Sequence, residues 1–129
     1  MISLIFIVVA AISVAIMDVI QFHFYESIFK NFPKFCNPET SWKNKYREGI
    51  TTPKFFGSTT FLVWTTDLWH LAKFISIISF VLSIVFYKVH FSLGMDFTIL
   101  FATYSSVFEL FYSQHLIKSP CFLTPLSIL

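Results

Sequence analysis

Apolar residues form three long runs along the chain, separated by polar segments. The first run extends from about Ile2 to Phe22 and contains no charged residue before Asp18. As an α-helix, these residues would rise about 31 Å, which matches the hydrocarbon thickness of a bilayer. The run has no basic start and no convincing cleavage site, so we interpret it as a retained membrane span rather than a signal peptide.

The second and third runs cover about residues 60–87 and 97–117. Ser58, Thr59 and Thr60 precede the second run and are residue types that cap a helix N-terminus. A helix from there to Tyr87 would be about 45 Å long and would exceed the hydrocarbon core. We therefore expect residues 60–69 to lie at the interface or in a protein-lined cleft.

The segment between the first two runs, residues 30–57, has a different composition. It contains three prolines and half of the charged residues, which argues against a span. Aromatic residues such as Trp42 and Tyr46 are interspersed among its lysines, so we expect this loop to lie on the membrane surface.

The composition supports a membrane environment. Of the 129 residues, 56% are hydrophobic and 12% are charged, whereas soluble domains have about a quarter charged residues. The chain thus lacks the polar surface that a small soluble domain needs. We predict an all-α integral membrane bundle of three transmembrane helices, forming a single membrane domain over residues 1–129, with an interfacial basic loop between helices 1 and 2.

Basic residues indicate the orientation of the chain. Seven Lys and Arg residues are expected on one membrane face and only Lys88 on the other; the seven are Lys30, Lys34, Lys43, Lys45, Arg47, Lys54 and Lys118. Short loops rich in Lys and Arg stay in the cytoplasm. We predict a multi-pass protein of the cell membrane with its N-terminus outside and its C-terminus in the cytoplasm. The net charge of +2 gives no indication of nucleic-acid binding.

Ionisable residues gather at the same predicted face, because three alternating helices bring the end of the first, the start of the second and the end of the third together. These residues are Asp18, His23, Glu26, Asp67, His70, Lys73, Glu109 and His115. A charge inside a span costs about 2.5–3.5 kcal/mol and usually faces inward. We expect Asp18, Asp67 and a polar stripe of the third helix to face each other; the stripe is Ala102, Ser105, Ser106, Glu109, Tyr112 and Ser113. Anchoring of helix ends in the headgroup region is the alternative.

Two pairs in this group have the spacing of helical metal ligands. His23 and Glu26, and likewise Asp67 and His70, are three residues apart and lie on adjacent helical turns. A divalent metal is therefore a candidate cofactor, with these four side chains as ligands. Hydrogen bonds along each helix surface are the alternative interpretation. Cys36 and Cys121 are isolated and indicate neither a disulfide nor a thiolate zinc site.

The same face has the residues for chemistry at a lipid headgroup. Asp18, His23, Asp67 and His70 are candidate catalytic residues, since a carboxylate beside an imidazole can perform acid–base catalysis. Lys43 and Lys45 would attract a phosphate, and free amides near Ser58 and Thr59 would bind it. Membrane lipids are the expected partners. Control of topology is the alternative role for the lysines.

The sequence leaves the activity open, including whether the chain is an enzyme. Our sharper hypothesis is a lipid-interface enzyme or binding protein with a polar site at the cytoplasmic face. Two alternatives remain: an accessory or assembly subunit of a larger membrane complex, and a homo-oligomeric proton-coupled transporter using Glu109 with His115 or Lys73.

Four short motifs carry a resemblance to a protein family. They are Met17-Asp-Val-Ile-Gln-Phe-His23, Ser41-Trp-Lys-Asn-Lys-Tyr46, Lys54-Phe-Phe-Gly-Ser-Thr-Thr60 and Thr66-Asp-Leu-Trp-His70. With these motifs, residues 17–74 resemble an uncharacterised family of small bacterial polytopic membrane proteins. The resemblance implies no activity, but it does imply that the polar residues of these motifs form a unit. These are Asp18, His23, Trp42, Asn44, Tyr46, Asp67 and His70.

Overall fold

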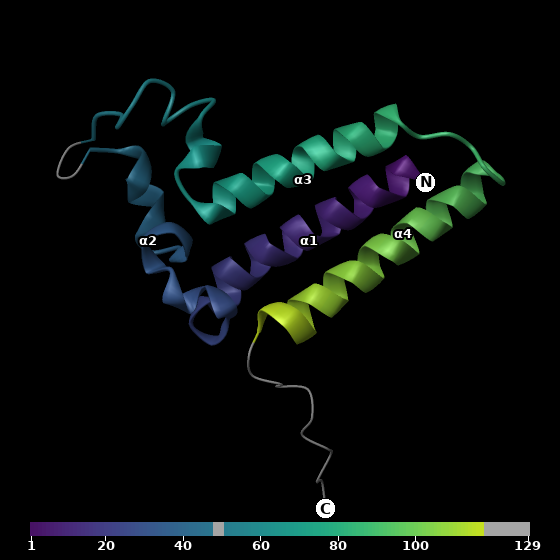
Figure 1. Cartoon of the computed structure of the whole chain (residues 1–129), viewed down its shortest axis with the longest axis horizontal. Coiled ribbons are helices and arrows are strands. Elements are labelled where there is room, and N and C mark those ends of the chain that lie inside the picture. The colour runs from purple at the N-terminus through teal and green to yellow at the C-terminus, as the bar shows by residue number, and fades with distance from the viewer. Residues whose placement is uncertain (48–50, 118–129) are drawn as a thin grey trace, which may run out of the picture.

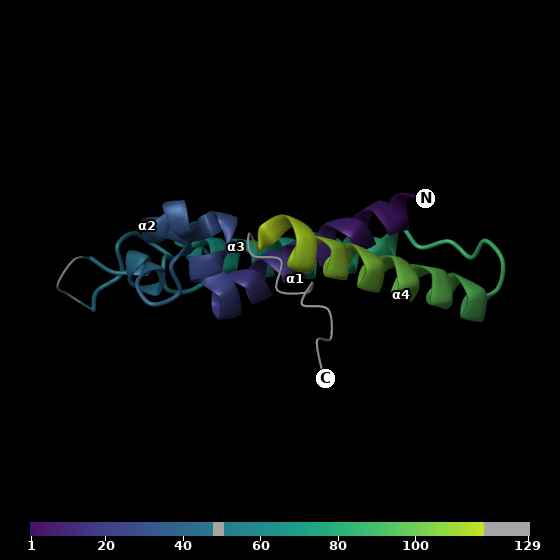
Figure 2. The same ribbon diagram turned by 90° about the horizontal axis from the view of Figure 1, so that it is seen from below.

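Three long helices lie side by side, with α1 (Ile2–His23) between α3 (Leu68–Val85) and α4 (Leu93–Leu110) (Figure 1). This computed structural model of the chain describes residues 1–47 and 51–117. Seen from below, the long helices form a single layer (Figure 2). Because α3 runs opposite to α1 and α4, the end of α1, the start of α3 and the end of α4 share one end of the bundle, as predicted.

Small side chains form the contact between α1 and α3. The buried residues of α3 are Ala72, Ser76, Ser79 and Ser83, and those of α1 include Ala10, Ala11 and Ala15. Small residues let two backbones approach closely, which is how helices in membranes gain contact area. The Ser3 hydroxyl donates to the Ser83 carbonyl oxygen at 2.9 Å and joins the two helices at the far end. α1 therefore packs most extensively against α3.

The outer faces of the helices are apolar and exposed. Large side chains such as Ile77 and Val81 of α3 and Leu93 and Leu110 of α4 are exposed. Two helical segments, Ile2–Glu26 and Leu68–Val85, are long and apolar enough to cross a membrane, and only 39% and 22% of them is buried. Within the described ranges α4 does not join them: it has the length of a span, but its polar residues lower its hydropathy.

The prediction that the second helix begins near residue 60 is wrong, since α3 begins at Leu68. Gly57 has a φ of 82°, a left-handed conformation that starts a series of turns. Asp67 is the N-cap of α3, because its backbone is extended and its side chain accepts from the His70 amide. The resulting helix of 18 residues is about 27 Å long, so no over-long span has to be accommodated.

The third helix starts earlier than predicted. α4 begins at Leu93, where the Ser92 hydroxyl accepts from the Met95 amide at 3.3 Å. It continues as the π-helix η5 (Phe111–Leu116), which ends close to the predicted boundary at residue 117. Lys118, which contributes to the predicted charge asymmetry, and Cys121 lie outside the described residues.

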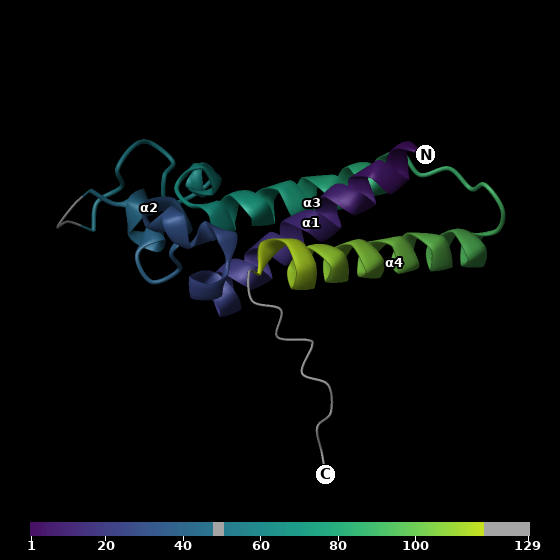
Figure 3. The same cartoon turned by 60° about the horizontal axis from the view of Figure 1, so that its bottom comes forward.

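Residues 24–66, hereafter the cap, connect α1 to α3 through short helices and turns. The short helices are η1 (Phe24–Glu26), η2 (Ile28–Asn31), α2 (Pro33–Cys36), η3 (Ser41–Lys45) and η4 (Val63–Thr65). An isolated backbone bridge between Ser27 and Ile117 joins the cap to the end of η5. Figure 3 shows the cap extending beyond one end of the three long helices. The prediction that this segment contains no span is confirmed for its described part.

Replacing Ser79 by Leu should destabilise the bundle. Ser79 is 4% exposed and faces α1, so a larger side chain would separate the helices. Over-packing of this kind costs about 1–3 kcal/mol. Denaturant titration of the protein in detergent micelles would measure the free energy of unfolding. Ser105→Leu is the matched control, since Ser105 is exposed on α4. Equal stability of the two variants would contradict the proposed α1–α3 contact.

Candidate functional site

Asp67 and His70 form a partly buried polar pair at the start of α3. Asp67 Oδ2 lies 2.7 Å from His70 Nδ1, and Asp67 Oδ1 accepts from the His70 amide at 3.0 Å. The Asp67 side chain is 2% exposed and the His70 side chain is 26% exposed. The buried carboxylate thus both caps the helix and fixes the orientation of the imidazole ring.

The cap positions Asp67 from the other side. The Asn44 side-chain amide donates to the Thr66 carbonyl oxygen at 3.0 Å and to the Lys34 carbonyl oxygen at 2.6 Å. The buried Thr66 hydroxyl lies 3.2 Å from Asp67 Oδ2. These contacts join α2, η3 and the start of α3, so Asn44 fixes the backbone beside Asp67 from a distant part of the sequence. Of the unit that the resemblance implies, Asn44, Asp67 and His70 lie close together, whereas Asp18 and His23 do not join them.

The hydrogen bond between His70 and Asp67 determines which ring nitrogen of His70 is free to react. An ionised carboxylate only accepts hydrogen bonds, so Nδ1 of His70 donates to Asp67. In the neutral ring, Nε2 then has its lone pair free to accept a proton or bind a cation. Carboxylate-oriented imidazoles of this type serve as general bases and as metal ligands. The geometry is equally that of a well-formed helix N-terminus.

Asp18 and His23 face α4 rather than Asp67. The Asp18 carboxylate lies near the phenols of Tyr104 and Tyr112, and the His23 ring stacks edge-on against Tyr112 at a centroid distance of 5.7 Å. His23 Nδ1 is 3.6 Å from Glu26 Oε2, at an exposed position. The four candidate catalytic residues therefore form two groups at one end of the bundle, one on each side of α1.

The predicted metal site is not assembled in the described part of the chain. Both i, i+3 pairs form: the carboxylate oxygen lies 3.6 Å from the imidazole nitrogen in the pair of His23 with Glu26, and 2.7 Å from it in the pair of Asp67 with His70. However, no group of three or more His, Cys, Asp or Glu side chains comes together within residues 1–47 and 51–117. A single site built from all four residues is therefore wrong. The reason is the rotation of α1, which directs its polar residues towards α4.

The predicted orientation of the polar stripe on the third helix is wrong for most of its residues. Ala102, Ser105, Ser106 and Glu109 are exposed, although the prediction placed them inside the bundle. Tyr112 does face the bundle as predicted, and with Phe108 and Phe111 it packs around Ala15, Val19 and Leu116. Large aromatic side chains provide more contact area there than serine does.

The predicted phosphate site near Ser58 and Thr59 needs correction too. Ser58 is fully buried, and its hydroxyl donates to the Lys45 carbonyl oxygen at 2.8 Å and accepts from the Lys54 amide at 3.1 Å. Thr59 is exposed, and neither residue caps a helix. The amides of Ser58 and Thr60 already donate to the carbonyl oxygens of Phe55 and Gly57. Ser58 is a structural residue that closes the turn between η3 and residue 57.

The basic residues of the cap are at its surface, accompanied by aromatic rings. Lys43 Nζ lies 5.6 Å from the Trp42 ring centroid, and Lys45 Nζ lies 5.3 Å from that of Tyr46. Lys43 is exposed and Lys45 is half-buried. Further exposed aromatic side chains of the cap are Tyr25, Phe32, Phe55, Phe56 and Phe61. Such a mixture of cations and aromatic rings is typical of a surface at the membrane–water interface.

Cys36 is a buried thiol within the cap. It is 4% exposed and lies at the end of α2. Burial raises the pKa of its thiol above the ordinary value, which lowers the thiolate fraction at neutral pH. Cys36 is thus a packing residue of the cap and not an activated nucleophile.

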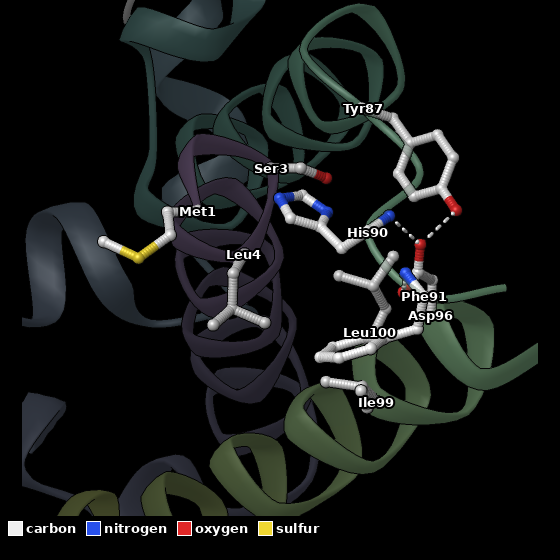
Figure 4. A pocket seen from close by; sticks show the side chains of 9 residues that line it. All are labelled: Met1, Ser3, Leu4, Tyr87, His90, Phe91, Asp96, Ile99 and Leu100. Atoms are coloured by element: carbon white, nitrogen blue, oxygen red, sulfur yellow. Dashed lines mark hydrogen bonds between the residues drawn. The ribbon is translucent and has the colours of Figure 1, made fainter. Parts of the chain in front are cut away.

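Sequence analysis missed a second polar group, at the opposite end of the bundle. The Asp96 carboxylate accepts from the Tyr87 hydroxyl at 3.0 Å and from the amides of His90 and Phe91 at 2.8 and 3.3 Å. Partial burial, followed by the hydrogen bond to Asp96, raises the pKa of Tyr87. These residues line a cavity of about 150 Å³ together with Ser3 (Figure 4). The sequence did contain a signal for this group, because the ionisable residues Tyr87 and His90 precede Asp96 by a few positions.

Comparison with protein-family models, with curated proteins and with solved structures found no match. The resemblance to a family of small bacterial membrane proteins therefore stays a prediction, and the function is argued from the geometry alone.

Replacing Asp67 by Ala should release the His70 ring. The variant loses the hydrogen bond that selects the Nδ1–H tautomer of His70. It also loses the N-cap hydrogen bond of α3, which should cost about 1 kcal/mol of stability. ¹⁵N NMR of histidine-labelled protein in micelles would show the tautomer. Glu26→Ala is the matched control, because His23 and Glu26 are 3.6 Å apart and exposed. An unchanged His70 spectrum in the Asp67 variant would disprove the assignment.

Proposed function

We propose that the chain is a multi-pass integral membrane protein whose cap binds the headgroups of anionic phospholipids at the cytoplasmic interface. The observation that carries this proposal is the exposed set of lysines and aromatic rings on the cap, at the end of two helices that could span a bilayer. Lipid tails would cover the exposed apolar faces of α3 and α4, and the cap would lie among the headgroups.

The proposed orientation of the chain in the membrane follows from three spans and the positive-inside rule. α4 with η5 covers 24 residues, or about 36 Å, enough to cross the hydrocarbon. The cap has most of the Lys and Arg residues, whereas the turn between α3 and α4 has only Lys88. The cap is therefore cytoplasmic in this proposal, and the turn is outside.

The headgroup contact would be electrostatic and aromatic. Each Lys or Arg near an anionic membrane surface contributes about 1 kcal/mol to binding. Trp42 and Tyr46 have amphipathic rings that favour the headgroup level. Their ring centroids are 6.4 Å apart, and each ring has a neighbouring lysine ammonium within 6 Å of its centroid, which brings the two cations close to one aromatic pair. The order of the cap, held by Asn44 and Ser58, would present this surface as a fixed patch.

A second candidate function is acid–base chemistry on a bound lipid, with His70 as the base. The observation that favours this function is the 2.7 Å contact of His70 Nδ1 with the buried Asp67 carboxylate. This contact would leave the Nε2 atom of His70 free to accept a proton from a bound lipid. The Nδ1–H tautomer of His70 is the precondition for this candidate, and so the tautomer measurement described for Asp67→Ala also tests it. Lipid binding by the cap does not require it.

Single cysteines should report three spans. In a chain without Cys36 and Cys121, an impermeant maleimide added to intact cells should label Val89→Cys, in the turn after α3. It should not label Thr51→Cys, in the cap, or Gln114→Cys, in η5, until the cells are permeabilised. All three native residues are exposed. Labelling of Gln114→Cys in intact cells would show that α4 does not cross the membrane.

Removing two cap lysines should weaken binding of anionic lipid. The double variant Lys43→Gln, Lys45→Gln should bind a short-chain phosphatidylglycerol about 30-fold more weakly, from two contributions of about 1 kcal/mol. The NMR signal of the Trp42 indole N–H would report binding at the cap. Lys88→Gln, at the other end of the bundle, should leave this titration unchanged. Equal binding of phosphatidylcholine would contradict the proposal.

A further inference from the structure

Two neighbouring cavities lie at the end of the bundle remote from the cap. The smaller one, about 150 Å³, lies between the start of α1 and the turn that joins α3 to α4 (Figure 4). The larger one, about 520 Å³, lies between α3 and α4, with Ile7 of α1 in its wall. Both are lined by Tyr87 and Leu100, so the two cavities adjoin each other. Together they connect the interfacial turn with the apolar middle of the bundle.

The larger cavity is an apolar groove between two helices that barely touch. Phe80 and Ile84 of α3 form one wall, and Phe101 and Tyr104 of α4 form the other. Since both helices pack against α1 rather than against each other, the groove persists between them. Its volume is within the range of about 300–1,000 Å³ that is typical of sites for a single organic ligand.

The size of the groove distinguishes between two kinds of apolar occupant. One turn of a helix, 5.4 Å high and about 10–12 Å across, takes up about 420–610 Å³. The groove could therefore hold about one turn of a partner helix, which is far less than a membrane span. The Phe80 and Tyr104 rings, with centroids 5.8 Å apart, close the inner end of the groove. A flexible hydrocarbon chain is narrow enough to lie in the groove between that contact and Tyr87.

The polar end of the groove has the charge to receive an acidic headgroup. The His90 side chain lines the smaller cavity, and in Figure 4 its ring points towards Ser3. Lys88 is exposed two residues earlier in the same turn. The Asp96 carboxylate already accepts three hydrogen bonds from this turn, so it is occupied within the protein. A phosphate at this end would meet an ammonium group and an imidazole.

We propose that the groove between α3 and α4 binds one acyl chain of an anionic phospholipid from the surrounding leaflet, with the phosphate near Lys88 and His90. The site is at the opposite end of the bundle from the cap and does not depend on headgroup binding there. The Ser3–Ser83 hydrogen bond lies beside it and holds the start of α1 against α3, which keeps the groove walls in place.

Photo-crosslinking would test the site directly. The purified chain in detergent micelles is irradiated with phosphatidylglycerol that has a photoreactive group in one acyl chain, and labelled residues are mapped by mass spectrometry. The expected labels are on residues that line the groove, such as Phe80, Ile84, Phe101 and Tyr104. Leu100→Trp, which fills the junction of the two cavities, should reduce labelling at least tenfold. Leu110→Trp, the same change at an exposed position of α4 outside both cavities, should leave labelling unchanged.

Further variants separate the chain contact from the headgroup contact. Ile84→Trp obstructs the groove from α3 at an exposed position, so it should reduce labelling even if Leu100→Trp does not fold. Lys88→Gln with His90→Gln should reduce labelling by phosphatidylglycerol more than labelling by phosphatidylcholine, because the choline cation already compensates the phosphate charge of the second lipid. Labels spread evenly over all exposed apolar faces would indicate annular lipid and overturn the proposal. Cross-links between two copies through the groove would also overturn it.

Discussion

The structure depends on the close contact of α1 with α3 through alanine and serine side chains. In a membrane, lipid tails are as apolar as leucine, so helices associate through contact area and hydrogen bonds between them. The small residues Ala10, Ala11, Ser76 and Ser79 provide that contact, and the Ser3–Ser83 hydrogen bond completes it at one end. α4 packs on the other side of α1 through aromatic side chains. The central helix thus determines both the single layer of helices and the groove between α3 and α4.

The cap depends on a second set of contacts, centred on Asp67. This carboxylate lies where the cap ends, and it accepts the hydrogen bond that begins α3. The Thr66 hydroxyl bonds to the carboxylate, and Asn44 bonds to the Thr66 backbone. The exposed lysines and aromatic rings are consequently presented on an ordered surface at one end of the bundle. At the other end, Asp96 organises the turn between α3 and α4 in a comparable way, through three hydrogen bonds. Each end of the bundle therefore has one buried carboxylate that orders the adjoining loop.

The exposed polar face of α4 distinguishes this helix from the other two. Ser105, Ser106 and Glu109 are exposed, and α4 is less apolar than α1 and α3, although it is long enough to span a bilayer. A charged residue such as Glu109 would be costly against lipid unless it lies near the interface or meets a partner. Glu109 is at the last turn of α4, on the side of the cap. If the chain were an accessory subunit, this face of α4 is where a partner protein would bind.

The sequence by itself determined the helices and their alternation, because hydropathy and helix length are local properties of the chain. It predicted a helix at residues 2–22, found at Ile2–His23, and it identified the Asp67–His70 pair from its i, i+3 spacing. Only the tertiary structure decided how each helix is rotated. That rotation directed Asp18 towards Tyr112, exposed Ser105 and Glu109, and kept the candidate metal ligands in two groups. The start of α3 and the cavity at Tyr87 likewise depend on contacts between residues distant in sequence, such as that of Ser58 with Lys45. Such contacts cannot be predicted from hydropathy along the chain, because hydropathy is a local property.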